Sequence, residues 1–79
     1  MINAKTAKIL VTAGAEATLQ ILDGQGKQGR LVLQLGDAKE TIATQRNPRE
    51  ARLFSLATAI NFLTRIGYAK TVKVTMQRG

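Results

Sequence analysis

The chain has 79 residues, of which 12 are Lys or Arg and 5 are Asp or Glu, so its formal net charge is +7 at pH 7. It contains no His, no Cys and no Trp. Imidazole or thiolate metal sites, disulfide bridges, and Ser-His or Cys-His nucleophilic pairs are therefore excluded. The length leaves room for one compact domain, residues 1–79, and the apolar fraction of 44% is that of an ordinary globular protein.

The start of the chain predicts neither export nor insertion into a membrane. Its apolar stretch is only Ile9-Leu10-Val11 before Thr12 interrupts it, whereas a signal peptide needs about 7–15 apolar residues. No segment approaches the roughly 18 apolar residues of a membrane span. The absence of cysteine agrees with a reducing compartment, and we expect a cytoplasmic protein.

Alternation of apolar and polar residues predicts strands over most of the chain outside residues 47–66. The predicted strands are, in chain order, 6–13, 17–21, 31–35, a weaker strand at 39–45, and 70–77. Turn residues separate the first four, namely Gly14-Ala15, the glycine-rich stretch 23–29 and Gly36-Asp37.

Before the last strand the period changes to that of a helix, which we predict from Pro48 to Ile66. Asn47 would cap this helix, Pro48 would occupy its first position, and Glu50 would complete a capping box. Gly67 would end the helix in the left-handed conformation. Apolar residues fill about half of the circumference, which is wider than the roughly 100° stripe that packs on a sheet.

These elements predict an α+β fold with the order β-β-β-β-α-β. An antiparallel sheet of four to five strands would carry one long helix on one face. The broad apolar side of the helix has two explanations: either the sheet curls around the helix or a second subunit covers part of it. We favour a homodimer, since twofold dimers are the commonest soluble oligomers. The predicted dimer interface comprises Phe54, Ala59, Phe62 and Ile66.

Residues 24–29 have the glycine spacing G-x-G-x-x-G of dinucleotide-binding loops. That motif requires a following helix, so that phosphate meets a helix N-terminus, whereas here a strand follows. We therefore interpret the loop as a hairpin connection whose Lys27 and Arg30 can lie along a phosphate backbone. A solvated connector without a ligand is the alternative.

Arg46, Arg49 and Arg52 recur every third residue around the predicted helix start. Free backbone amides, the positive end of a helix dipole and guanidinium groups together form a phosphate site. The alternative is a scatter of surface arginines, one of them neutralised by Glu50.

The face of the sheet turned away from the helix is a second candidate surface for nucleic acid. The side chains predicted on it are Lys8, Thr18, Gln20, Arg30, Gln34, Thr71, Lys73, Thr75 and Gln77. Such side chains donate to phosphates and base edges, although Thr and Gln are also ordinary on a solvated sheet face. The three aromatic residues fall outside the predicted strands, so no base-stacking platform is expected.

The sequence therefore predicts a small basic protein that binds nucleic acid through backbone phosphates with low sequence specificity. It favours DNA over RNA as the ligand. The predicted binding residues are Lys8, Lys27, Arg30, Arg46, Arg49, Arg52, Lys73 and Thr75. The main alternative is a protein-interaction or assembly module without a nucleic-acid role. Attachment to an anionic membrane surface is a weaker alternative, because the polar side of the predicted helix carries little basic charge beyond Arg65.

Catalysis has little support in the sequence. Its acidic residues are Glu16, Asp23, Asp37, Glu40 and Glu50, and no spacing forces two of them together. We expect no enzymatic activity, no metal, no cofactor and no small-molecule substrate.

Overall fold

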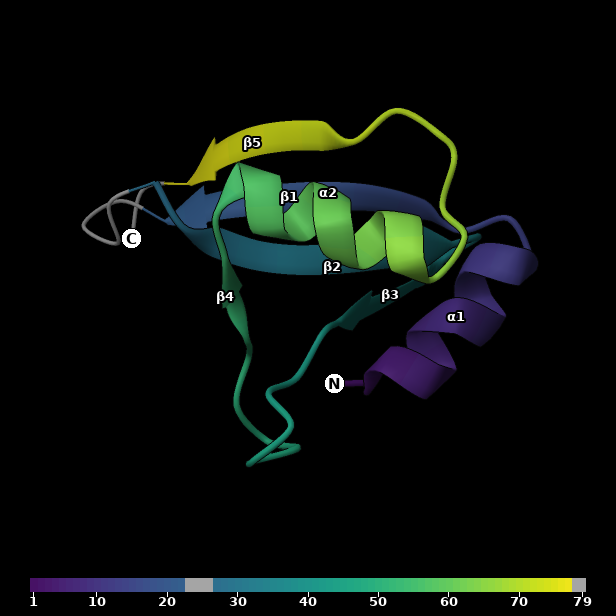
Figure 1. The fold of residues 1–79 in the computed structure, drawn as a ribbon, viewed down its shortest axis with the longest axis horizontal. Coiled ribbons are helices and arrows are strands. Elements are labelled where there is room, and N and C mark those ends of the chain that lie inside the picture. The colour runs from purple at the N-terminus through teal and green to yellow at the C-terminus, as the bar shows by residue number, and fades with distance from the viewer. Residues whose placement is uncertain (23–26, 78–79) are drawn as a thin grey trace.

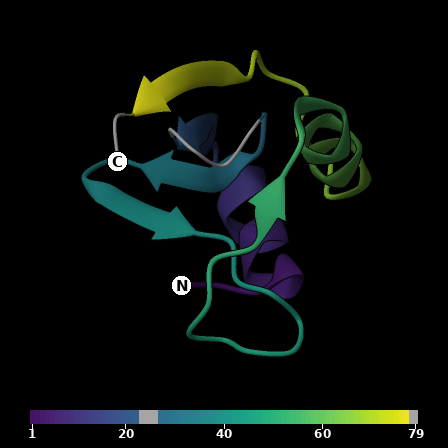
Figure 2. The same cartoon turned by 90° about the vertical axis from the view of Figure 1, so that its left-hand side faces the viewer.

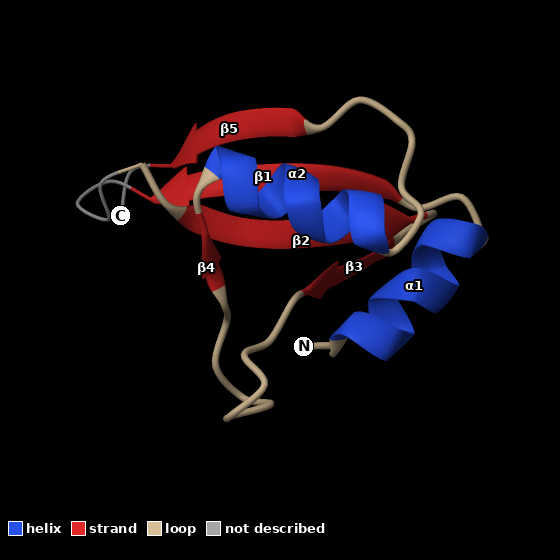
Figure 3. Ribbon diagram, viewed as in Figure 1, coloured by secondary structure: helices blue, strands red, loops and turns tan. Residues whose placement is uncertain are grey.

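The computed structural model describes residues 1–22 and 27–77, and it has an α+β fold of five strands and two helices (Figures 1 and 3). The elements are, in chain order, α1 (Ala4–Thr12), β1 (Glu16–Leu22), β2 (Gly29–Leu35), β3 (Ala38–Thr41), β4 (Leu53–Phe54), α2 (Leu56–Arg65) and β5 (Lys73–Gln77). Figure 2 shows both helices on the same side of the sheet. In the described part of the chain, neither helix is long and apolar enough to cross a membrane.

The sheet is mixed, with the order β3-β2-β1-β5, and β4 pairs with β2 next to β3. β2 is antiparallel to β1, β3 and β4, as predicted, but β5 runs parallel to β1. The prediction of a purely antiparallel sheet is therefore wrong. The reason is that α2 connects β4 to β5 as a crossover. Such a crossover brings the chain back to the end of the sheet at which β4 began, so β5 runs parallel to β4 and to β1.

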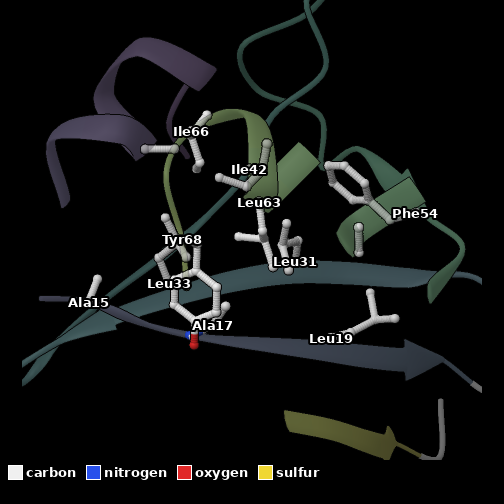
Figure 4. Close-up of a cluster of buried hydrophobic side chains, with 12 residues drawn as sticks. Ala15, Ala17, Leu19, Leu31, Leu33, Ile42, Phe54, Leu63, Ile66 and Tyr68 are labelled. Carbon is white, nitrogen blue, oxygen red and sulfur yellow. The ribbon is translucent and has the colours of Figure 1, made fainter. Parts of the chain in front are cut away.

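The core lies between this sheet and the two helices (Figure 4). The predicted alternation is confirmed on the face turned to the helices, where Leu19 lies opposite Leu31 and Ala17, Leu19, Leu31 and Leu33 are 0% exposed. In β2 the burial departs from the alternation at Val32, which has the opposite parity and is 8% exposed. The buried residues of the cluster are Ala7, Ala15, Ala17, Leu19, Leu31, Leu33, Ile42, Phe54, Ala59, Leu63, Ile66 and Tyr68. Side chains of the opposite parity point to the sheet's open face, which neither described helix covers.

The strand predicted at 6–13 is wrong, because this segment forms α1. The side chain of Asn3 accepts a hydrogen bond from the Thr6 amide at 2.9 Å and caps the helix. Gly14, with φ +103°, ends it in the left-handed region. Only Ala7 is fully buried and Ile9 is 63% exposed, so the alternating apolar residues of this segment do not share a buried face.

The long helix predicted from Pro48 to Ile66 is also wrong in its first half. The Asn47 side chain accepts from the Arg49 amide at 2.9 Å, and the Glu50 amide donates to the Asn47 carbonyl at 3.1 Å, so these residues form a turn. The helix begins instead after Ser55, whose hydroxyl accepts from the Thr58 amide at 3.2 Å. Gly67 ends it with φ +88°, as predicted.

The predicted strand at 39–45 is shorter in the structure, where β3 ends at Thr41. Beyond it, Ile42 forms an isolated parallel bridge with Ile2, and Ala43 forms an antiparallel bridge with Ala51. Residues 23–26 of the glycine-rich loop lie outside the described residues, and so does the first half of the motif at 24–29.

Candidate nucleic-acid interface

Between β3 and β4 the chain leaves the sheet as a projecting segment, residues 42–52, which we call the arm (Figure 1). Its two legs are hydrogen-bonded to each other: the Thr44 amide donates to the Glu50 carbonyl and the Arg52 amide donates to the Ile42 carbonyl, both at 2.9 Å. The Ile42 amide in turn donates to the Leu31 carbonyl of β2 at 3.0 Å. The base of the arm is thus fixed to the sheet.

The tip of the arm is held by its own polar side chains. The Thr44 hydroxyl accepts from the Asn47 amide and donates to the Asn47 carbonyl, both at 3.0 Å. Together with the turn around Asn47, these bonds close the tip, residues 45–49, into a defined loop. Arg46 and Arg49 are both exposed on this tip.

Arg52, at the base of the arm, is stacked on aromatic rings. Its guanidinium carbon lies 4.5 Å from the centroid of the Phe54 ring and 5.7 Å from that of Phe62. The two rings contact each other at a centroid distance of 5.4 Å with a tilt of 57°. Cation–π contact of this kind holds a guanidinium in one orientation while leaving its N–H donors free for a ligand.

Three arginines surround one hollow beside the arm. Arg46 and Arg52 of the arm and Arg65 in the last turn of α2 line a space of 380 Å³ together with Thr44 and Gln45, which we call the arginine hollow. None of the residues that line it is acidic. The ion pairs found within residues 1–22 and 27–77 lie elsewhere, between Lys73 and Glu16 and between the terminal amine and Glu40.

An apolar hollow of 250 Å³ adjoins the arginine hollow and shares part of its lining. Ile42, Phe62 and Ile66 form its apolar walls, and Arg52 and Arg65 line both spaces. A ligand that carries charge next to an apolar group can therefore occupy both hollows at once.

The arginines predicted as one cluster are separated by the arm. Arg49 lies on its other side, where it lines a space of 510 Å³ with Arg30 of β2 and with Glu50. This second space carries charges of both signs, whereas the arginine hollow carries only positive charge. Arg46 and Arg52 are thus brought together, and Arg49 is not brought to them.

The other predicted binding residues are divided between the open face of the sheet, α1 and the connection between β1 and β2. Arg30, Lys73 and Thr75 lie on the open face of the sheet, as the registers of β1 with β2 and β5 require. The Nζ atom of Lys73 lies 3.9 Å from Glu16, which offsets its charge. Lys8 was expected on the same face and is instead exposed on α1, because its segment is a helix, and Lys27 is exposed in the connection between β1 and β2.

The predicted dimer interface is for the most part inside the chain's own core. Phe54 and Ala59 are 0% exposed and Ile66 is 8% exposed, while Phe62 is half-buried against Phe54. Phe54, Ala59 and Ile66 are therefore covered within the chain itself, whereas Phe62 keeps part of its surface exposed. Phe62 contacts Phe54 within the same chain, which explains that part of the broad apolar side of the helix without a second copy.

Arg65 is the residue of this site that sequence reasoning missed. The predicted helix placed it on the solvent side, and α2 separates it from the arm in the sequence. Its position beside Arg52 follows only from the packing of α2 on the sheet, which no local pattern encodes.

Comparisons of the chain with protein-family models, with curated proteins and with solved structures find no match. Within the described residues, no group of three or more His, Cys, Asp or Glu side chains is placed to hold a metal ion.

Proposed function

We propose that this protein binds nucleic acid through backbone phosphates, with the arginine hollow as the principal contact. The observation that carries the proposal is the meeting of Arg46, Arg52 and Arg65 around one space that no acidic side chain lines. Like charges that line one space repel one another, and an anion between them offsets that repulsion.

Phosphate is the anion that matches these donors best. A planar guanidinium offers paired N–H groups that match two oxygens of a phosphate, and such charge-assisted hydrogen bonds are stronger than neutral ones. The net charge of +7 favours a polyanion over a single small anion, because the field of the whole chain acts on every phosphate of the strand.

The same lining supports low sequence specificity. Guanidinium groups dominate it, and Gln45 is its single side-chain amide of the kind that reads base edges. The adjoining apolar hollow can accept the flat or methylated side of a base without a hydrogen-bonding code. On the far side of the arm, Arg49 and Arg30 extend the contact to neighbouring phosphates.

The test is fluorescence anisotropy with labelled single-stranded DNA, duplex DNA and RNA over a series of salt concentrations. The informative variant is R46Q/R52Q/R65Q, and its matched control is K5Q/K8Q/K39Q, which removes the same charge from α1 and β3. We expect the arginine variant to bind at least tenfold more weakly, with a salt slope smaller by about 2 on single strands and nearly 3 on duplex.

The control variant should lose less affinity and keep a slope close to that of the natural sequence. Equal losses in the two variants would mean that net charge alone matters and that the arginine hollow is not the site. Absence of binding by the natural chain at low salt would end the proposal. Circular dichroism of each variant confirms that the comparison is made between folded chains.

A further inference from the structure

The outer edge of β5 is unpaired in the described structure. β5 is the last strand in the sheet order, and its described pairing is with β1 alone. An edge strand presents a row of backbone N–H and C=O groups to which another strand can bind. Natural monomers usually protect such an edge with charge, proline or a covering segment.

Exposed apolar side chains gather at this edge. Val74 is 47% and Met76 73% exposed, and the register with β1 places them on the same face as Leu19 and Ile21, the face on which α2 packs. Leu19 is fully buried, whereas these two side chains are open to solvent. The edge therefore has an apolar row that the chain does not bury by itself.

α2 contributes to the same patch from above. Leu56 and Ile60 are 44% and 45% exposed and lie one turn apart on one flank of the helix. The opposite flank carries Phe62, which contacts Phe54 of β4. Since β4 and β5 lie on opposite sides of α2 (Figure 1), the flank of Leu56 and Ile60 is the one that faces β5.

We infer that a second copy of this chain binds at β5, with the two β5 strands antiparallel about a twofold axis. In such a pair, residues of the same parity lie opposite each other, so the apolar row of one copy meets the apolar row of the other. With Val74 on the axis, Val72 lies opposite Met76 of the other copy and Lys73 lies opposite Thr75. Among the described residues 71–77 the edge is thus self-complementary, and no like charges lie directly opposite each other.

A stable interface of standard size buries roughly 800 Å² from each partner, about one seventh of the 5452 Å² that the chain exposes. The exposed apolar side chains available to it are Leu56 and Ile60 of α2 and Val74 and Met76 of β5. The arm lies at the opposite edge of the sheet, so this interface is independent of the proposed nucleic-acid site (Figure 1).

The test is the mass in solution, by size-exclusion chromatography with light scattering over a range of protein concentrations. We expect twice the chain mass of 8.5 kDa for the natural sequence and a single chain for M76K and V74K/M76K. The control is Ile9→Lys, which places the same charge on a comparably exposed apolar residue of α1 and should remain dimeric. Hydrogen exchange should show the amides of β5 more protected in the dimer than in M76K.

A natural chain that stays at 8.5 kDa up to the highest concentrations would overturn the inference. A dimer whose mass M76K does not change, and whose β5 amides exchange freely, would overturn it as well. Because Met76 is largely exposed, M76K is expected to fold even if the double variant does not.

Discussion

The two edges of the sheet differ in the side chains that they expose. At the β4 edge, the arm and the end of α2 hold Arg46, Arg52 and Arg65 around one hollow, and Arg52 is fixed by stacking on Phe54. At the β5 edge, Val74, Met76 and the near flank of α2 leave apolar surface open beside an unpaired strand. One edge is suited to an anion and the other to an apolar partner.

The arginines and the lysines are distributed differently over the molecule. The arginines that the structure describes, Arg30, Arg46, Arg49, Arg52 and Arg65, all lie on the arm, on β2 beside β4, or at the end of α2. The described lysines are spread over α1, β3, β5 and the connections. A nucleic acid and a second copy of the chain can therefore bind to opposite edges without competing.

The largest expected effect is that of Phe54→Ala, which breaks the β4 edge. Phe54 is fully buried, and removing its ring should lower the free energy of unfolding by about 3–5 kcal/mol in urea titrations.

Phe54→Leu keeps most of the apolar volume but removes the ring beneath Arg52, so it should weaken nucleic-acid binding while the chain stays folded. Leu19→Ala is the control, because it damages the core away from the arm. If F54L and L19A have the same affinity as the natural chain, the ring does not orient Arg52.

A smaller effect is expected from Tyr68→Phe, which acts at the β5 edge. The Tyr68 hydroxyl accepts from the Ala17 amide at 3.0 Å and donates to the Thr71 carbonyl at 2.8 Å, and so ties β1 to the connection that leads into β5. Without it the buried Ala17 amide has no acceptor, which costs about 1–3 kcal/mol of stability. The dimer should weaken with it, whereas the affinity of the folded chain for nucleic acid should not change.

Thr64→Ala is the control for that variant. It removes an exposed hydroxyl that donates to the Ile60 carbonyl at 2.8 Å, and its stability should stay within about 0.5 kcal/mol of the natural chain. A Tyr68→Phe chain as stable as the Thr64→Ala chain would show that the tie to β5 contributes nothing.

The smallest expected effect is that of Arg52→Lys, which separates the charge of Arg52 from its stacking. The charge remains, but the planar stacking on Phe54 and the paired donors are lost. Stability should fall by about 0.5–1 kcal/mol and nucleic-acid affinity by a few-fold, between the natural chain and Arg52→Gln. Anisotropy at two salt concentrations measures it, and an unchanged affinity would mean that only the charge of Arg52 matters.

The sequence predicts those parts of the fold in which local pattern and tertiary environment agree. β1 and β2 alternate and bury one face, and the positions of Gly14, Gly36 and Gly67 mark turns that the backbone takes with positive φ. The last strand is found at the right place, but its direction follows from the α2 crossover, which alternation does not reveal.

The errors come from signals that two structures share. Asn47 followed by Pro48 begins either a helix or a turn, and here the pairing of β4 with β2 decides for the turn. Alternation in the segment 6–13 indicates a strand, yet Asn3 and Gly14 bracket a helix that the pattern does not require. The arginine hollow depends on the first of these outcomes, because the arm exists only where the predicted helix is absent. It depends also on the packing of α2, which brings Arg65 to the arm.

The most direct test of the central claim is an NMR titration of the natural chain with a thymidine strand of about 12 nucleotides, a length in the range that one small domain covers. The side-chain Nε–H signals of Arg46, Arg52 and Arg65 and the amides of Thr44 and Gln45 should move most, while those of α1 and β5 stay in place. Shifts spread evenly over the surface, or gathered around Lys5, Lys8 and Lys39, would contradict the assignment of the arginine hollow as the nucleic-acid site.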